Sequence, residues 1–265
     1  MSLATWTPDA LSSSARGLTG RCWRVVEAQH VVSTMKLVDT LAEQALLEQL
    51  LEESKPPIPP ECRHLHYLLA TPFRYGSPYP RGSRFRREGL TPGVFYASQT
   101  PATAIAEVMF HRLLFFAESP RTPWPVNAGE HTAFAVRFRT AAGLDLTEAP
   151  LDRQAMHWSH PTNYEPCQAL ADAARAAGVQ ALRYRSVRDP RGGLNVALLT
   201  CAAFTSREPI ERQTWRLHWG VTGARAICDS PPRRLEFDRS TFTADPRIAA
   251  LRTRLIFGDS TPDPS

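Results

Sequence analysis

The stretch GSRFRREGLTPGVFYASQTPATAIAEV, residues 82–108, contains a loop, a strand and a helix in direct succession. Its first part is rich in glycine, proline and arginine, which is typical of an irregular loop. Residues 93–97 carry the β-branched and aromatic side chains of a short strand. Thr100 or Thr103 can cap a helix that runs from about residue 102 to 116. The stretch therefore predicts a loop–strand–helix unit whose helix bears a single carboxylate.

On the N-terminal side, residues 1–20 form a polar lead-in. The segment Cys22–Val26 has the apolar, β-branched content of a strand. Apolar residues at 3.6-residue spacing then predict an amphipathic helix over Met35–Glu53, which Ser33 or Thr34 can cap. A proline-rich connector ends this helix, because proline cannot continue it. The helical, proline-broken segment of about residues 30–70 is interpreted as an insertion.

On the C-terminal side, strands and helices follow without regular βαβ alternation. The alternating pattern of residues 131–139 predicts a half-buried strand. Gly178 closes an alanine-rich segment that predicts a helix from 164 to 177. Further strands are expected at residues 179–184, 194–204 and, at a sheet edge, 235–237. This mixed order predicts an α+β fold in a single domain, followed by a C-terminal extension over 229–265.

Composition narrows the class of protein. The chain has 265 residues, of which 43% are hydrophobic, enough for one sizeable core. No stretch approaches the roughly 20 apolar residues of a membrane span, and the N-terminus lacks the basic-then-apolar order of a secretory signal. We therefore expect a cytoplasmic protein with no membrane partner; homo-oligomerisation stays open. The net charge of +5 favours anionic ligands, either a nucleic acid or a dinucleotide.

Cysteines and histidines give no metal-site pattern. The 5 cysteines are widely spaced and form no CxxC pair, so we expect reduced thiols, mostly buried, and neither a zinc site nor a disulfide framework. The sequence contains no GxGxxG after a strand, no GxxxxGK[ST] and no HExxH. His64 and His66 form the one close histidine pair, which is more often structural than metal-binding. We therefore expect no metal, no Rossmann site and no P-loop.

The basic loop at residues 74–87 is the most unusual local feature. It contains five arginines and two tyrosines, and the helix that follows carries Glu107. Arginine presents a planar fork that matches phosphate oxygens, and nearby glycines let the backbone approach a ligand. On charge alone, a basic surface loop that contacts nucleic acid is as good an interpretation as a loop that binds the phosphates of a small ligand.

The order of the motifs resembles RES-domain proteins. The central block of that family is a Gly-x-Arg-aromatic turn, a strand ending Tyr-Ala-Ser and a helix with a glutamate, which correspond here to Gly82–Phe85, Gly93–Ser98 and Thr103–Val108. The later segment Tyr164–Leu170, with its Cys-Gln pair, is similar to a further family helix, although Glu165 stands where the family often has serine. Ser186 follows a strand, as the serine of the Arg-Glu-Ser name does. The resemblance covers roughly residues 21–205.

The resemblance implies a fold, an activity and a partner. The fold would be ADP-ribosyltransferase-like, with a bent or split β-sheet flanked by helices, in a RES domain over residues 21–228. The activity would be that of a toxin that degrades NAD by hydrolysis or phosphorolysis, with NAD, and for phosphorolysis phosphate, as ligands. The partner would be an Xre-type antitoxin. A second enzymatic alternative is transfer of ADP-ribose to a protein, which breaks the same bond.

The resemblance also assigns roles to residues. Glu107, Arg84 and Tyr96 would be catalytic, and the NAD-binding set would be Arg24, Arg74, Tyr75, Ser186, Tyr164 and Glu165. Arg24 and Arg74 are both candidates for the first arginine of the family. Cleavage of the nicotinamide–ribose bond builds positive charge on the ribose, which a carboxylate stabilises. Arginines neutralise the pyrophosphate, and a tyrosine face stacks on nicotinamide.

One alternative belongs to another class of function. The basic loop 74–87 could serve a nucleic-acid-binding module, with its interleaved aromatic side chains stacking on a single strand. Such a module has no need of a single helical carboxylate in a cleft. The position of the Glu107 side chain therefore discriminates between the two classes.

Overall fold

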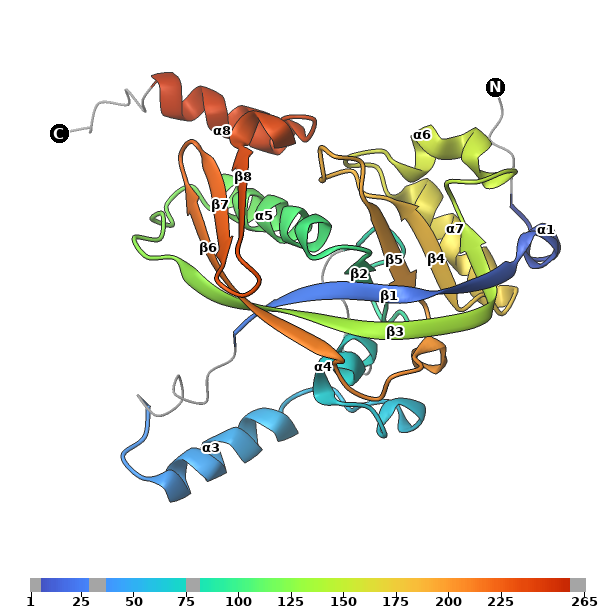
Figure 1. Ribbon diagram of the computed structural model, residues 1–265, viewed down its shortest axis with the longest axis horizontal. Coiled ribbons are helices and arrows are strands. Elements are labelled where there is room, and N and C mark those ends of the chain that lie inside the picture. Colours follow the sequence, from blue (N-terminus) through green and yellow to red (C-terminus); the bar gives the residue numbers. More distant parts are fainter. Residues whose placement is uncertain (1–5, 29–36, 75–81, 258–265) are drawn as a thin grey trace.

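The spine of the fold is a pair of long antiparallel strands, β1 (Arg16–Glu27) and β3 (Gly129–Asp145) (Figure 1). The computed structural model describes residues 6–28, 37–74 and 82–257, with side chains as far as residue 251. Because β1 and β3 pair along almost their whole length, each has one further edge on which other strands assemble.

Side chains of β3 alternate between two hydrophobic cores, as the pleat of a strand requires. Phe134 and Val136 belong to one core, and Ala133 and Ala135 to the other, beneath helix α5 (Pro101–Glu118). All four side chains are fully buried. The centre of the spine is therefore covered on both faces.

Six shorter strands complete an eight-stranded sheet among the described residues, in the order β1-β2-β5-β4-β3-β6-β7-β8. Their bounds are Phe95–Ser98 for β2, Ala181–Arg185 for β4, Leu194–Leu198 for β5, Glu211–Gly220 for β6, Gly223–Cys228 for β7 and Arg233–Asp238 for β8.

The sheet divides at β3. The first half of β3 pairs antiparallel with β6, whereas its last residues pair in parallel with β4. Trp23 of β1 also pairs with Ser98 of β2, so β1, β2, β5, β4 and β3 form a closed ring of hydrogen-bonded strands. A bent, split sheet in one domain confirms the expected α+β fold class.

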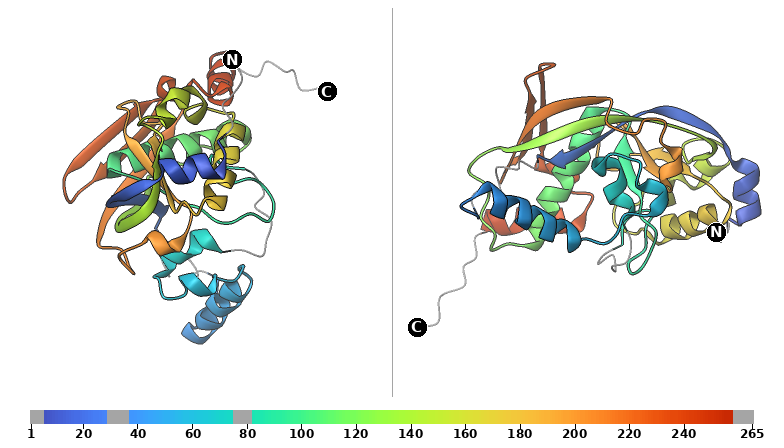
Figure 2. Two further views of the ribbon diagram at one scale, coloured as in Figure 1. Left: turned by 90° about the vertical axis from the view of Figure 1, so that its right-hand side faces the viewer. Right: turned by 90° about the horizontal axis from the view of Figure 1, so that it is seen from below.

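Seven α-helices lie within the described ranges. Besides α5 they are α1 (Pro8–Ser14), α3 (Leu41–Glu53), α4 (Tyr67–Ala70), α6 (Ala155–Trp158), α7 (Glu165–Ala176) and α8 (Pro246–Phe257). Helices α5 and α8 lie beside β6–β8, and α1, α6 and α7 gather near β4 at the other end of the molecule (Figure 1). Helix α3 projects from the body (Figure 2). In the part of the chain that the structure describes, no helix is long and apolar enough to cross a membrane.

Helix α3 begins later than its sequence pattern predicts. The expected start at Met35 and the Ser33–Thr34 cap lie outside the described residues, and residues 37–40 are not helical. Thr40 and Glu43 form a capping box in which each side chain accepts a hydrogen bond from the backbone of the other. This reciprocal cap satisfies the first free N–H groups and therefore sets the start of the helix at residue 41.

Two terminal segments contribute more to the fold than their polar composition indicates. The lead-in over residues 1–20 contains α1, whose Leu11 is fully buried, and the beginning of β1 at Arg16. In the C-terminal extension, β8 extends the sheet, and Phe242 and Ile248 complete the core around α5. Strands β6 and β7 are absent from the sequence-based expectation. Isolated apolar residues in a polar stretch become core residues only through tertiary packing.

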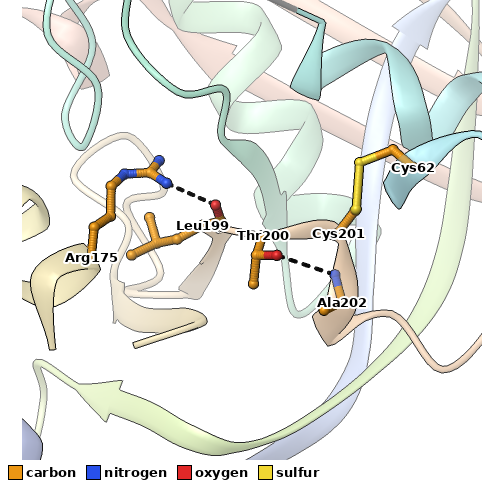
Figure 3. Close-up of a disulfide and its surroundings, with 6 residues drawn as sticks. All are labelled: Cys62, Arg175, Leu199, Thr200, Cys201 and Ala202. Atoms are coloured by element: carbon orange, nitrogen blue, oxygen red, sulfur yellow. Dashed lines mark hydrogen bonds between the residues drawn. A yellow bond between two sulfur atoms is a disulfide. The ribbon is translucent and has the colours of Figure 1, made fainter. Parts of the chain in front are cut away.

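The expectation of reduced cysteines is wrong for one pair. Cys62 and Cys201, which are 139 positions apart, form a disulfide with Cα atoms 6.0 Å apart (Figure 3). It joins the turn at 60–62 to the turn at 201–203 that follows β5. The spacing of cysteines in a sequence does not reveal such a pairing. Cys22, Cys167 and Cys228 are free and buried, and burial raises the pKa of Cys22 to about 12.

Candidate functional site

A cleft of about 980 Å³ runs between α5, the strands β1 and β2, and the turn that precedes β2. Six of the candidate residues line it: Arg24, Arg74, Arg84, Tyr96, Glu107 and Tyr164. Ser186 does not line it but contacts Glu107 directly. The exposed Glu165 lies outside the cleft lining, and Tyr75 lies outside the described residues. The structure thus brings together residues that lie far apart in the sequence.

Glu107 is held on α5 by two side chains from other elements. Its Oε1 atom accepts hydrogen bonds from Ser186 Oγ and from Asn195 Nδ2, each 2.7 Å long. Asn195 is oriented in turn by Ser98, whose Oγ donates to Asn195 Oδ1 over 2.6 Å. Ser98 and Asn195 are buried opposite each other on β2 and β5. The carboxylate is therefore fixed in position at the wall of the cleft.

Ser186 positions Glu107 and also shapes the turn after β4. Its Oγ accepts hydrogen bonds from the backbone N–H groups of Arg188 and Asp189. The hydroxyl proton goes to Glu107, and the side chain is buried. Contact of Ser186 with the ligand stays a prediction; in the structure its hydroxyl group donates to Glu107 and accepts from two backbone N–H groups.

Tyr96 anchors the Gly-x-Arg turn through its hydroxyl group. Its oxygen accepts a hydrogen bond of 2.9 Å from the backbone N–H of Phe85 and lies 3.0 Å from Ser83 Oγ. On the other side of the turn, Gln168 of α7 donates to the carbonyl of Ser83. A Cβ atom on Gly82 would lie 2.7 Å from Gln168 Nε2. The glycine of the turn and the glutamine of the Cys-Gln pair therefore pack directly against each other.

Arg84 is buried within that turn. Its guanidinium donates to the carbonyl oxygens of Trp158 at 2.7 Å and His160 at 3.1 Å, and lies 4.8 Å from the ring centroid of Tyr164. It was expected to bind pyrophosphate. These contacts give it a second role, because it also ties the segment after α6 to the cleft while its positive charge stays at the wall.

The two candidates for the first arginine occupy different parts of the cleft. Arg24 lies on β1, where its guanidinium donates to the carbonyl of Tyr96 at 3.3 Å and packs over Phe95. Arg74 forms an ion pair with Glu52 at the end of α3 and donates to the carbonyl of Pro56. Arg24 is therefore attached to the strand of Tyr96, and Arg74 to the proline-rich connector.

The cleft lining also contains polar residues that were not expected from the sequence, among them His111, Arg188, Asn195 and Arg247. For two of them the sequence contains a pattern that could have identified them. His111 follows Glu107 by four positions, which places both on one helical face. Asn195 is the polar residue in an otherwise apolar strand. Arg188 and Arg247 meet only in the folded chain, where both approach Asp245.

Arg188 is the most enclosed of the cleft cations. Its guanidinium lies 3.5 Å from the ring centroid of Phe110 and donates to the carbonyl of Pro161. Burial lowers its pKa, and the nearby Tyr164 opposes this shift. Asp245, which is fully buried, lies 3.8 Å away and accepts a 2.8 Å hydrogen bond from Arg247. The C-terminal extension thus closes one end of the cleft.

Metal ligation finds no support in the site. Within the described ranges, no group of three or more His, Cys, Asp or Glu side chains could hold a metal ion. The titratable groups that line the cleft are arginines, two histidines, tyrosines and carboxylates. This set suits an anionic organic ligand with a centre that becomes positively charged.

Comparisons with known proteins identify the family. No curated protein matches this chain. Among solved structures, the chain is similar to one in the crystal structure of the M. tuberculosis MbcT–MbcA toxin–antitoxin complex, with a TM-score of 0.42 and 13% identity over 93% of this chain and 94% of that one. The family model for the RES domain matches residues 58–220, which is more than half of the sequence. The chain therefore belongs to the RES domain family.

Proposed function

We propose that this protein is the toxin of a RES/Xre toxin–antitoxin system and consumes NAD by cleaving the bond between nicotinamide and ribose, by hydrolysis or phosphorolysis. The observation that carries this proposal is the Glu107 carboxylate, which Ser186 and Asn195 hold at the wall of a cleft lined by arginines. A volume of about 980 Å³ is within the range of pockets that enclose small organic ligands.

The chemistry follows from the residue types. As the C–N bond breaks, positive charge develops on the ribose, and a fixed carboxylate stabilises this charge without having to reorganise. Glu107 fits this role because two donors already hold it. Arg24 and Arg84 supply positive charge for the pyrophosphate. The hydroxyl of Tyr96 is engaged in the turn, and Tyr96 lines the cleft, where its ring is the proposed stacking surface for nicotinamide.

The family match bears on the two arginines. It begins at residue 58 and so includes Arg74 but not Arg24. Arg74 is committed to Glu52, whereas Arg24 contacts the strand of Tyr96. Both arginines line the cleft, and we keep both as candidates for ligand binding; Arg74 also fixes the proline-rich connector.

Two other functions remain alternatives. Transfer of ADP-ribose to a protein uses the same bond cleavage and the same residues, and differs in the acceptor. The nucleic-acid hypothesis has less support, because the described arginines of the loop have partners within the chain. Arg74 pairs with Glu52, Arg84 is buried, and Arg86 donates to Thr91. A surface that binds phosphates along a strand needs such side chains to be free.

The test is an assay of nicotinamide release by the purified full-length protein incubated with NAD. Products are separated by chromatography with and without inorganic phosphate, so that ADP-ribose, its 1-phosphate and modified protein are distinguished. The matched variants are Glu107→Gln and Glu236→Gln, which remove one carboxylate in the cleft and one exposed carboxylate of β8 outside it. Nicotinamide release that is lost in the first and retained in the second supports the proposal. Absence of release by the parent protein refutes it.

A further inference from the structure

Helix α5 carries a second titratable side chain in the cleft. His111 lies one turn after Glu107, and residues four positions apart lie on the same face of a helix. Both line the cleft. His111 is an exposed residue that lines the cleft, whereas Phe110 and Leu113 beside it are fully buried. The helix therefore presents a carboxylate and an imidazole side by side to any ligand.

The charges that face His111 come from four elements. Glu107 lies on the same helix, Arg84 on the turn before β2, Arg188 on the loop after β4, and Arg247 on α8. The walls of the cleft desolvate the imidazolium and lower the pKa of His111; the three arginines lower it further, and Glu107 raises it. At neutral pH the imidazole is consequently uncharged and has a nitrogen lone pair that can accept a proton.

The neighbouring groups are already committed to other partners. Glu107 accepts hydrogen bonds from Ser186 and Asn195, and Arg247 is paired with Asp245 and Glu118. The other histidine of the cleft lining, His131, is 3% exposed and packs against Trp219. His111 is thus the imidazole that can contact a ligand beside Glu107.

We propose that His111 is a catalytic residue of the NAD cleavage proposed above, and that it accepts the proton of an attacking water molecule. This inference rests on the proposed function and deepens it, because it assigns hydrolysis as the reaction. Phosphate, which is anionic at neutral pH, can attack without giving up a proton, and a base next to it would have no task.

The bond between ribose C1′ and the nicotinamide nitrogen breaks, and its electron pair goes to that nitrogen, which loses its positive charge. The water oxygen bonds to C1′, and one water proton moves to a ring nitrogen of His111. The imidazolium then releases this proton to solvent. The sum is NAD⁺ plus water giving nicotinamide, ADP-ribose and one proton.

The experiment measures nicotinamide release as a function of pH, in phosphate-free buffer, for the parent, His111→Gln and His64→Gln. His64 is an exposed histidine outside the cleft lining and serves as the matched control. Loss of a general base typically slows a reaction about 100- to 10,000-fold. We expect such a loss in His111→Gln. The rate of the parent should fall at acid pH, where His111 is protonated, and this fall should be absent in His111→Gln. His64→Gln should behave like the parent.

Rescue by azide separates loss of the base from loss of the fold. Azide attacks C1′ without losing a proton, so it should restore nicotinamide release in His111→Gln and yield the azido derivative of ADP-ribose. It should not restore release in Glu107→Gln, which lacks the charge that stabilises the ribose cation. The rescue also demonstrates that the variant is folded and binds NAD.

The outcomes distinguish failure of the proposed NAD cleavage from failure of the proposed role of His111. A parent protein that releases no nicotinamide overturns the proposed function itself. An active parent whose His111→Gln variant has the same rate and pH profile overturns the role of His111 alone. A parent that needs phosphate and forms ADP-ribose 1-phosphate at the same rate with or without His111 also overturns it.

Discussion

Asn195 of β5 donates a 2.7 Å hydrogen bond to the carboxylate of Glu107 on α5, although the two residues are 88 positions apart. Ser98 orients Asn195 from the neighbouring strand, so the position of the carboxylate depends on the register between β2 and β5.

We expect Asn195→Ala to lower kcat of NAD cleavage, because the carboxylate becomes mobile. Misplacing a catalytic group by about 1 Å costs roughly 100-fold. KM should change little, since the arginines are untouched. An unchanged kcat in steady-state kinetics would remove Asn195 from the mechanism.

Arg84 has a structural as well as a binding role, and its removal should affect both. Arg84→Ala removes a donor from the buried carbonyl oxygen of Trp158 and from the partly buried carbonyl oxygen of His160, and loss of a donor to a buried acceptor typically costs about 1–3 kcal/mol of unfolding free energy. It should also weaken NAD binding. Arg87→Ala is the control, because Arg87 forms an exposed ion pair with Asp172, worth about 0–1 kcal/mol. Urea denaturation and calorimetric titration of NAD measure the two effects; equal stability of both variants would contradict the structural role.

Asp245 should make stability depend on acid pH. Burial raises its pKa, but the hydrogen bonds from Arg247 and the positive charges of Arg247 and Arg188 together lower it more, so that the net pKa lies below the ordinary value. With a folded-state pKa below the unfolded value of about 3.9, the stabilisation is complete above that pH and is lost as pH falls through the folded value.

Asp245→Asn tests this dependence. It leaves Arg188 buried without its compensating charge, and loss of one member of a buried pair costs about 3–5 kcal/mol. The variant should be less stable at pH 7, and its stability should fall less steeply from about pH 5 to pH 2. Asp229→Asn, which removes an exposed carboxylate paired with Arg216, is the control. Parallel pH curves for Asp245→Asn and the parent would contradict the prediction.

The disulfide should contribute to stability. Cross-linking residues this far apart restricts the unfolded chain, and removal of such a bond typically costs about 2–5 kcal/mol. We expect Cys62→Ser to lower the denaturation midpoint and the parent to respond to reductant. Cys228→Ser, which removes a free buried thiol, should leave the response to reductant intact. Thiol titration of the unfolded protein provides the direct count; five reactive thiols without reductant would show that the bond does not form.

Expression in cells tests the toxin hypothesis. An enzyme that consumes NAD should arrest growth when it is produced without its antitoxin, and the arrest should disappear in Glu107→Gln but persist in Glu236→Gln. Colony counts and cellular NAD measured after induction provide the readout. Normal growth with undiminished NAD on production of the intact protein would count against both the NAD and the toxin assignments.

Local features of the fold could be predicted because they depend on neighbouring residues. The alternation over 131–139 lies within β3, and the helix that carries Glu107 begins after its Thr100 cap. Helix α7 occupies the alanine-rich segment that ends at Gly178. The ordered motifs predicted the RES family, which the match over residues 58–220 confirms. Hydrophobic period and capping act within a few residues, so the sequence displays them directly.

The contacts of the cleft depended on tertiary structure. The sequence alone determined that this chain is an α+β RES protein with arginines, a tyrosine and a glutamate in the family order. Only the folded chain decided that Ser186 and Asn195 hold Glu107, that Arg84 is buried, and that Cys62 meets Cys201. The physical reason is that such contacts join segments far apart in sequence. They are set by strand register and by the packing of α5 on the sheet, and local patterns carry no information about either.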